Sequence, residues 1–304
     1  MEEKDILKRL IKSDPLFNMI HVVNQKYDIL PDDKEHLGAY IEYQDICELR
    51  EDFLEELSDC IVSWIYSSEK YNELRSIAIA NGKDERGASH EVCRKARNKF
   101  RGLHAKDNLL IQGQLGELLL FTFIQRYMQA VPLLRKMPIT TSSEHERFGA
   151  DAIHYKIDNG KNIIVLGEAK TYTSNYRFKT AFEDALTSIL STYKNHRAEL
   201  HSYVHEDFLD KEMDKVAEEY LCNKLKNVEV HLVSIITYNE TKTLTINSEN
   251  EIKKQIENII ADKYKSFDNS KIDIKKNPIL KRITYIVFPV WDLKDLAMKF
   301  QKLI

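Results

Sequence analysis

The stretch GADAIHYKIDNGKNIIVLGEAK, residues 149–170, carries side chains near both ends that could do chemistry. Asp151 lies near its start, Glu168 and Lys170 lie near its end, and most residues between them suit two short apolar strands. Two carboxylates supply the hard oxygen ligands that Mg²⁺ takes, usually together with waters and a substrate phosphate. A neighbouring lysine could orient or deprotonate a water, but as a base it would need a pKa well below about 10.4. These residue types fit a metal site that handles a phosphate.

A turn signal in the middle of this stretch predicts how the two acids meet. Asn159-Gly160 is typical of a two-residue type I′ turn between antiparallel strands. Such a turn fixes the register of the hairpin, and counting outward from it places Asp151 directly opposite Glu168. Opposed carboxylates repel one another unless they share a proton or a cation. The sequence therefore predicts a divalent metal between Asp151 and Glu168, with Mg²⁺ preferred and Mn²⁺ as an alternative.

The alternation of side chains along a strand adds a third group to the pair. Lys170 is predicted on the same sheet face as Asp151 and Glu168, whereas His154 falls on the other face and is interpreted as structural. A modest ion pair between Glu168 and Lys170 would be the better explanation of an isolated Glu-Ala-Lys tripeptide. The matched position of Asp151 and the apolar approach on both strands favour the metal site.

A further acid, Glu117, lies on a predicted helix over residues 107–130. The residues that share its helical face are mostly apolar. A charge among them is costly to bury unless it is paired or coordinates a metal. From the residues alone, two interpretations stay open: Glu117 serves the metal site, or it lies at a helix edge and pairs with an arginine.

The elements that must position these residues follow from hydrophobic periodicity and β-branched runs. Helices are expected at residues 46–66, 69–80, 107–130, 178–203, 206–226, 249–265 and 291–303, and strands near 133–139 and at 228–238 and 283–290. A polar loop is expected at residues 81–89. This order predicts an α/β fold with a mixed central sheet flanked by helices.

Composition and charge limit the class of protein. With 43% hydrophobic and 31% charged residues in 304, the chain is typical of a soluble globular protein. The opening MEEKDILKRL lacks the apolar core of a signal peptide, no apolar run is long enough to cross a bilayer, and the four cysteines are widely spaced. A cytoplasmic location, without a membrane, is therefore predicted.

The net charge of −3 hides an asymmetry along the chain. Residues 1–60 hold sixteen Asp/Glu and seven Lys/Arg, a net charge of −9, so the remaining residues carry +6. Segment 93–106 has six Lys/Arg and no acid. It suits contacts with phosphates or with a partner protein, although a solvated helix face explains it as well.

The order of Glu117 on a helix, Asp151 on the next hairpin and Glu168-Ala169-Lys170 at its end resembles the PD-(D/E)xK nuclease superfamily. The match is specific in order, spacing and element type, although Ala150 stands where the superfamily's name has proline. The resemblance implies a restriction-endonuclease-like core. It also implies that Asp151 and Glu168 bind Mg²⁺, that Lys170 handles the attacking water, and that Glu117 completes or orients the metal shell.

The segments GELLL, FGADAIHY and VLGEAK further resemble the HamA family of nuclease subunits from Hachiman anti-phage defence. That resemblance implies a Mg²⁺-dependent deoxyribonuclease that cleaves DNA under the control of a superfamily-two helicase partner, HamB. Because the sequence has no GxxxxGK(S/T) loop, an ATP-driven motor would have to lie on another polypeptide.

We predict a mostly helical N-terminal region at residues 1–100, suited to partner contact, and a nuclease domain at residues 101–304. The alternative function is a nuclease-fold subunit that only binds within a DNA-processing complex and does not cleave.

Overall fold

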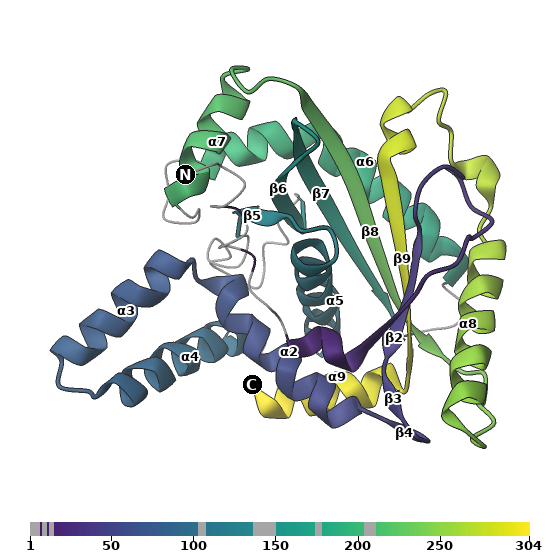
Figure 1. Cartoon of the computed structure of the whole chain (residues 1–304), viewed down its shortest axis with the longest axis horizontal. Coiled ribbons are helices and arrows are strands. Elements are labelled where there is room, and N and C mark those ends of the chain that lie inside the picture. Colours follow the sequence, from purple (N-terminus) through teal and green to yellow (C-terminus); the bar gives the residue numbers. More distant parts are fainter. Residues whose placement is uncertain are drawn as a thin grey trace.

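The computed structural model describes residues 7, 11, 15–102, 108–135, 150–173, 178–203 and 211–304. Within these residues a mixed seven-stranded sheet has the order β1-β2-β9-β8-β7-β6-β5, with helices on both faces (Figure 1). Its strands are β1 (Ile20–Val23), β2 (Leu37–Ile41), β5 (Val131–Leu134), β6 (Ala152–Asp158), β7 (Lys161–Tyr172), β8 (Val228–Glu240) and β9 (Ile283–Trp291). The predicted α/β class, a mixed sheet flanked by helices, is confirmed.

The helices connect and cover these strands. They are α2 (Arg50–Ile65), α3 (Ser68–Ala80), α4 (Glu85–Gly102), α5 (Asn108–Arg126), α6 (Phe178–Tyr203), α7 (Lys211–Leu221), α8 (Glu249–Lys265) and α9 (Leu293–Leu303). Shorter elements are the 3₁₀ turns η1 (Pro15–Met19), η4 (Asn269–Lys271) and η5 (Pro278–Arg282), and the small ribbon of β3 (Tyr43–Gln44) with β4 (Cys47–Glu48). Among the described residues, no helix has the length and apolar character needed to cross a bilayer.

The neighbouring strands β7, β8 and β9 run in the same direction. β7 pairs in parallel with β8, and β8 pairs in parallel with β9. Helices α6 and α7 connect β7 to β8, and α8 connects β8 to β9, as parallel pairing requires. The carboxyl ends of all three strands therefore meet at one end of the sheet, and their amino ends meet at the other.

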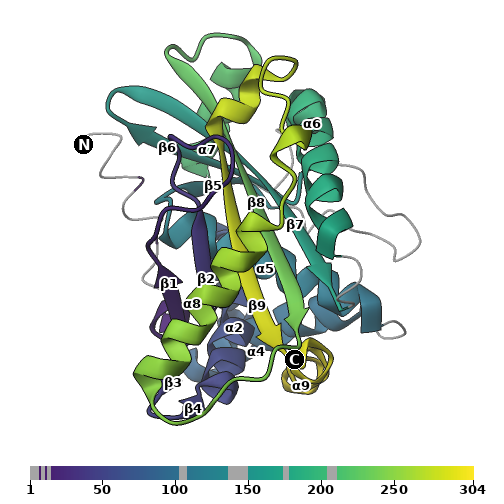
Figure 2. The same cartoon turned by 90° about the vertical axis from the view of Figure 1, so that its right-hand side faces the viewer.

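Two hydrophobic cores lie on the two faces of this sheet. One contains side chains of α6 and α8, such as Phe182 and Ile256, and Figure 2 shows both helices on the same side. The other contains side chains of α2, α5 and α9, such as Phe53, Leu119 and Phe300. The central strand β8 is covered on both faces, which explains its nearly continuous apolar sequence.

Several predicted elements differ from those observed in their limits. The helices at 178–203 and 249–265 are confirmed with those limits, whereas α7 is shorter than predicted and α4 begins inside the expected polar loop, at Glu85. The strand expected near 133–139 is represented by β5, and residues 136–149 lie outside the described part.

The strands β1 and β2 were not expected from the sequence, because both are short and β2 joins the sheet through a strand near the other end of the chain. β1 pairs with β2, and β2 pairs in parallel with β9. A Cβ at Gly38 would lie 2.5 Å from the Tyr27 hydroxyl and 2.7 Å from Cγ2 of Ile260 on α8, so glycine at this position leaves room for both side chains. The first 100 residues thus contribute two strands to the common sheet, and the division at residue 100 stays a prediction.

His154 on β6 lies on the sheet face covered by α5, as the alternation predicted. Its ring is fully buried, packs edge-on against Phe121 at 5.2 Å between ring centroids, and has no hydrogen-bond partner at either nitrogen among the described residues. Burial, with a smaller contribution from Arg135, lowers the pKa of His154 to about 3. The imidazole is therefore a neutral part of the core.

This histidine should make the free energy of unfolding depend on pH. In the unfolded chain its pKa is about 6.5, so between that value and about 3 the unfolded state binds more protons and stability falls as pH falls. The expected loss from His154 is about 2 kcal/mol between neutral pH and about pH 5. Denaturant titrations at several pH values would measure it. His154→Leu should lack this component, whereas His201→Leu at an exposed site should keep it; equal slopes in all three proteins would contradict the assignment.

Candidate active site

The hairpin has the register that the Asn159-Gly160 turn predicts. β6 and β7 pair without interruption from Asp158 opposite Lys161 to Ala152 opposite Gly167. Asn159 and Gly160 have φ values of 48° and 74°, as a type I′ turn requires. The described ladder ends at the pair Ala152–Gly167, so the placement of Asp151 directly opposite Glu168 is not part of it and stays a prediction.

Asp151 is held against the end of β7 by two hydrogen bonds. Its N–H donates to the Gly167 carbonyl at 3.1 Å, and its Oδ2 accepts from the Ala169 N–H at 2.9 Å. The carboxylate therefore lies at the backbone of the residue between Glu168 and Lys170.

Glu168 is a buried carboxylate, 3% exposed, on the sheet face covered by α6. Its Oε1 accepts hydrogen bonds from Lys170 Nζ at 2.9 Å and from Ser188 Oγ at 2.5 Å. Its Oε2 accepts from Thr192 Oγ1 at 3.2 Å. Ser188 and Thr192 lie one turn apart on α6, so one helix supplies both hydroxyls.

The charges at this position act on one another. Burial raises the pKa of Glu168 and the negative charge of Asp151 raises it further, while Lys170 and Ser188 oppose the shift. For Lys170, burial alone would lower the pKa, but the Glu168 carboxylate and more distant acids raise it overall. The lowered pKa that a lysine base would need is not produced here. The arrangement favours an ammonium that orients a water or a phosphate.

Glu117 comes from the opposite side of the sheet. It is half-buried on α5, which packs on β7 through the core that does not contain α6. The adjacent Gly116 lies so close to β7 that a Cβ would be 2.3 Å from Thr171 Oγ1 and 3.6 Å from Ala169 Cβ. The residue before Glu117 therefore contacts the carboxyl-terminal half of β7 on the face opposite Glu168, and the role of Glu117 at the metal stays a prediction.

Glu117→Gln should lower metal-dependent cleavage on the order of 10²-fold if this carboxylate orients a metal ligand. Its free energy of unfolding should change little, because the amide keeps the size and much of the hydrogen bonding. Initial cleavage rates and denaturant midpoints would measure the two effects. Glu257→Gln, at a half-buried position on α8, is the matched control. A fully active Glu117 variant would leave this glutamate a structural role.

The donor chemistry of Asp151 and Glu168 fits a divalent cation. Both supply hard carboxylate oxygens, and Mg²⁺ is usually bound by one or two carboxylates, waters and a substrate phosphate. A cation would also offset the repulsion that raises the Glu168 pKa. In the described part of the chain, no three His, Cys, Asp or Glu side chains form a cluster suited to metal binding. A metal site at Asp151 and Glu168, with Glu117 completing or orienting its shell, stays a prediction.

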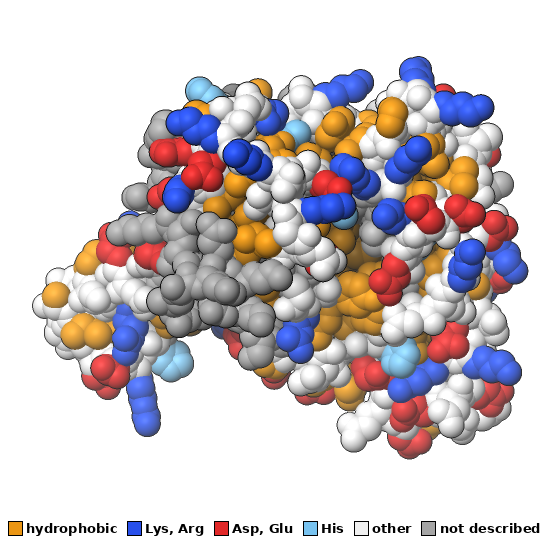
Figure 3. Space-filling view, turned by 45° about the horizontal axis from the view of Figure 1, so that its top comes forward, with side chains coloured by type: hydrophobic (Ala, Val, Ile, Leu, Met, Phe, Trp, Pro, Cys, Tyr) orange, Lys and Arg blue, Asp and Glu red, His pale blue; other side chains and the backbone are white. Residues whose placement is uncertain are grey.

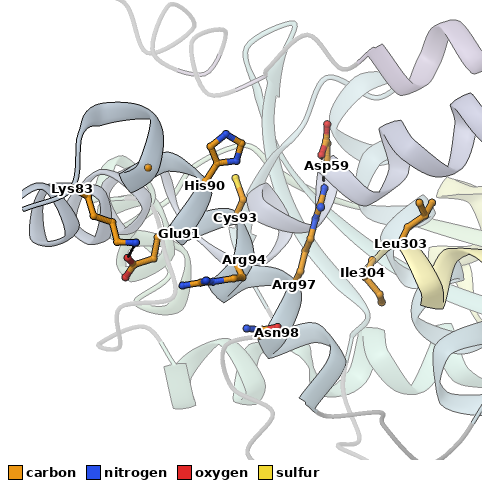
Figure 4. Close-up of a pocket in the computed structure, with 11 residues that line it drawn as sticks. Asp59, Lys83, His90, Glu91, Cys93, Arg94, Arg97, Asn98, Leu303 and Ile304 are labelled. Atoms are coloured by element: carbon orange, nitrogen blue, oxygen red, sulfur yellow. Dashed lines mark hydrogen bonds and ion pairs between the residues drawn. The ribbon is translucent and has the colours of Figure 1, made fainter.

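The basic segment 93–106 begins on α4 and borders a cavity of about 790 Å³ next to α2 and the end of α9 (Figure 4). Arg97 pairs with Asp59 at 2.9 Å, and Lys83 on the same wall pairs with Glu91 at 3.0 Å. Acids of the fold therefore neutralise part of this charge, while Arg94 stays exposed. Side chains 101–106 lie outside the described residues, and contact of the segment with DNA or a partner stays a prediction.

The contacts of Ser188 and Thr192 with Glu168 were not predicted from the sequence. Both lie on the mostly apolar face of the helix at 178–203, and polar residues one turn apart on such a face were the available signal.

Comparison with known proteins supports the resemblance noted in the sequence. The model of the HamA family matches residues 15–304, which include the hairpin, α5 and the whole sheet. No curated protein matches the chain. Because the family model covers nearly all of it, the chain belongs to the HamA family.

Proposed function

We propose that this Hachiman-type defence protein is a metal-dependent deoxyribonuclease that cleaves phosphodiester bonds within DNA and is controlled by a helicase partner. The observation that carries the proposal is the Glu168 carboxylate. It is buried next to a second acid, Asp151, and within hydrogen-bonding distance of Lys170. A fold gains little stability from such a group, because burying charge is costly. Its cost is explained if the site binds a cation and a phosphate.

Each residue of the site would have a separate role in hydrolysis. Asp151 and Glu168 would hold Mg²⁺, or Mn²⁺ in its place, which supplies Lewis-acid stabilisation of charge on the phosphate. Ser188 and Thr192 fix the orientation of the Glu168 carboxylate through its two oxygens. Lys170 Nζ is positioned to donate a hydrogen bond to the attacking water or to a phosphate oxygen. Glu117 would orient the shell from the α5 side.

The test is cleavage of supercoiled and linear DNA by the purified chain with Mg²⁺, with Mn²⁺ and with EDTA. We expect products with either metal and none with EDTA. Products that form equally well in EDTA would contradict a metal-dependent mechanism, and a complete lack of cleavage by the chain and by its helicase complex would contradict the nuclease.

One observation favours the alternative of a subunit that binds without cleaving. Both oxygens of Glu168 already accept hydrogen bonds from Lys170, Ser188 and Thr192. Such a carboxylate could serve only to join β7 to α6. The alternative predicts that Glu168→Gln changes stability and leaves the activity of the complex unchanged, which separates it from the nuclease.

A further inference from the structure

A second charged surface lies at the end of the sheet opposite the Glu168 site. Three segments that are far apart in the sequence meet there: the β6–β7 turn, the loop between α7 and β8, and η5 before β9. Figure 1 shows all three at the top of the molecule, and Lys and Arg side chains gather along the upper edge of Figure 3. We call this surface the basic end. Its cations are Lys156, Lys161, Lys224, Lys226, Lys281 and Arg282, and its acids are Asp158 and Glu229.

Glu229 at the start of β8 joins the segments. Lys161 Nζ lies 2.7 Å from its carboxylate and Arg282 lies 3.4 Å from it, while His231 Nε2 is at 3.2 Å. Hydrogen bonding from Lys161 and then from His231 lowers the pKa of Glu229 to about 2. This one carboxylate is shared by cations of the β6–β7 turn and of η5, so it offsets only part of their charge.

Four lysines of the basic end have no such partner. Lys156, Lys224, Lys226 and Lys281 make no ion pair with any described residue, and the last three are exposed. Each side chain can therefore reach an external anion without breaking a contact of the fold.

The loop that carries Lys224 and Lys226 is held in place by the surrounding structure. Arg197 of α6 donates to the carbonyls of Tyr220 and Leu221, both at 3.0 Å, and to Asn223 Oδ1 at 2.9 Å. Asn162 Nδ2 at the start of β7 donates to the Lys226 carbonyl at 2.7 Å. These contacts fix the backbone between the two lysines, so the surface is formed before any ligand arrives.

The chemistry of this surface fits a polyanion better than a protein. Protein interfaces have apolar and aromatic centres and contain little lysine. The large hydrophobic side chains that are exposed in the described chain belong to other segments: Ile46, Ile77, Ile79, Ile246, Met298 and Leu303. Lysines on separate loops suit phosphates repeated along a nucleic-acid backbone.

We propose that the basic end binds the phosphate backbone of duplex DNA at a second position, away from the cleavage site. The choice of DNA as the polyanion rests on the proposed function. Lys161 and Glu168 are separated by seven residues of β7, or about 23 Å at ~3.3 Å per residue. A duplex that engages both positions must span at least that distance. The basic end thus contributes affinity without base specificity, because backbone contacts carry no direct sequence information.

The test replaces Lys156, Lys224, Lys226 and Lys281 together by Gln and measures binding of a duplex of about 30 base pairs by fluorescence anisotropy in EDTA. The matched control replaces Lys254, Lys265, Lys294 and Lys302 by Gln. These four lysines are exposed, make no ion pair with a described residue and give the same change in net charge. We expect Kd to rise at least ~10-fold in the first variant, and the magnitude of the slope of log K against log salt to fall by about 3.6 if each lysine contacts one phosphate, since each contact contributes ~0.9. The control should change the slope by less than about 1.

Equal changes of Kd and of the salt slope in the two variants would show that only the net charge affects DNA binding, which would overturn the proposal. An unchanged Kd would also overturn it, including the case in which the first variant instead loses a co-purified protein partner. The outcome is separable from that of the proposed function. A chain that binds DNA through the basic end but never cleaves it would contradict the nuclease alone, and one that cleaves but binds DNA normally without the four lysines would contradict this proposal alone.

Discussion

Glu168→Gln is expected to abolish metal-dependent DNA cleavage, with a loss of about 10³-fold or more. A bound cation supplies several kcal/mol of transition-state stabilisation, and about 4 kcal/mol corresponds to that factor in rate. The amide keeps the size of the side chain; its one oxygen can still accept from one of the hydroxyls of Ser188 and Thr192, and its nitrogen can donate to the other. It has no charge with which to hold a metal. Because burial and the charge of Asp151 raise the pKa of Glu168, the neutral amide also removes an unfavourable interaction, and the variant should still fold.

Single-turnover cleavage rates and denaturant titrations on the same preparations would measure both effects. Glu240→Gln is the matched control, because Glu240 is also 3% exposed and ends the neighbouring strand β8. It should keep the cleavage rate even if stability changes. Asp151→Asn should lose cleavage as Glu168→Gln does. If Glu168→Gln cleaves at the wild-type rate, the buried carboxylate serves the fold and the proposed mechanism is wrong.

Cleavage of intact duplex DNA by the complex with its helicase partner is expected to require ATP, with a difference of at least ~10-fold between its presence and absence. A nuclease that recognises the phosphate backbone has little base specificity, so it would endanger the cell's own chromosome unless it is restrained. The chain has no GxxxxGK(S/T) loop with which to use ATP itself. Its first 60 residues carry a net charge of −9, which is a poor surface for DNA and a suitable one for a protein. We therefore expect a partner to control the activity.

The measurement compares the isolated chain, the complex without nucleotide, and the complex with ATP or a non-hydrolysable analogue. The same complex carrying Glu168→Gln shows how much cleavage comes from contaminating nucleases. We expect the complex to cleave duplex DNA with ATP but not with the analogue. A helicase that releases or delivers the nuclease by moving along DNA would need to hydrolyse ATP. Equal rates for the isolated chain and for the complex with and without ATP would rule out control by the partner.

The local features of the site could be predicted from the sequence because local interactions determine them. The Asn159-Gly160 turn predicts the register of β6 and β7, and that register holds as far as the pair Ala152–Gly167, next to Asp151 and Glu168. The limits of α6 and α8 were also predicted, since each helix has a regular apolar face. Ser248 caps α8 by accepting from the Glu251 N–H.

Other features were decided only by the tertiary structure, because they depend on contacts between distant parts of the chain. The strand β2 exists through its pairing with β9, roughly 250 residues away in the sequence. The Ser188 and Thr192 hydroxyls donate hydrogen bonds to the Glu168 carboxylate only because α6 packs on β7. The pKa of Lys170 is raised chiefly by Glu168 of its own strand and by Asp151, with Asp184 of α6 adding to the shift, whereas a lysine base would need a lower pKa. The basic end likewise forms from three separate segments. The sequence determined which groups are present and their local order, while long-range packing determined their neighbours, and neighbours set both the charge state and the chemistry of a buried group.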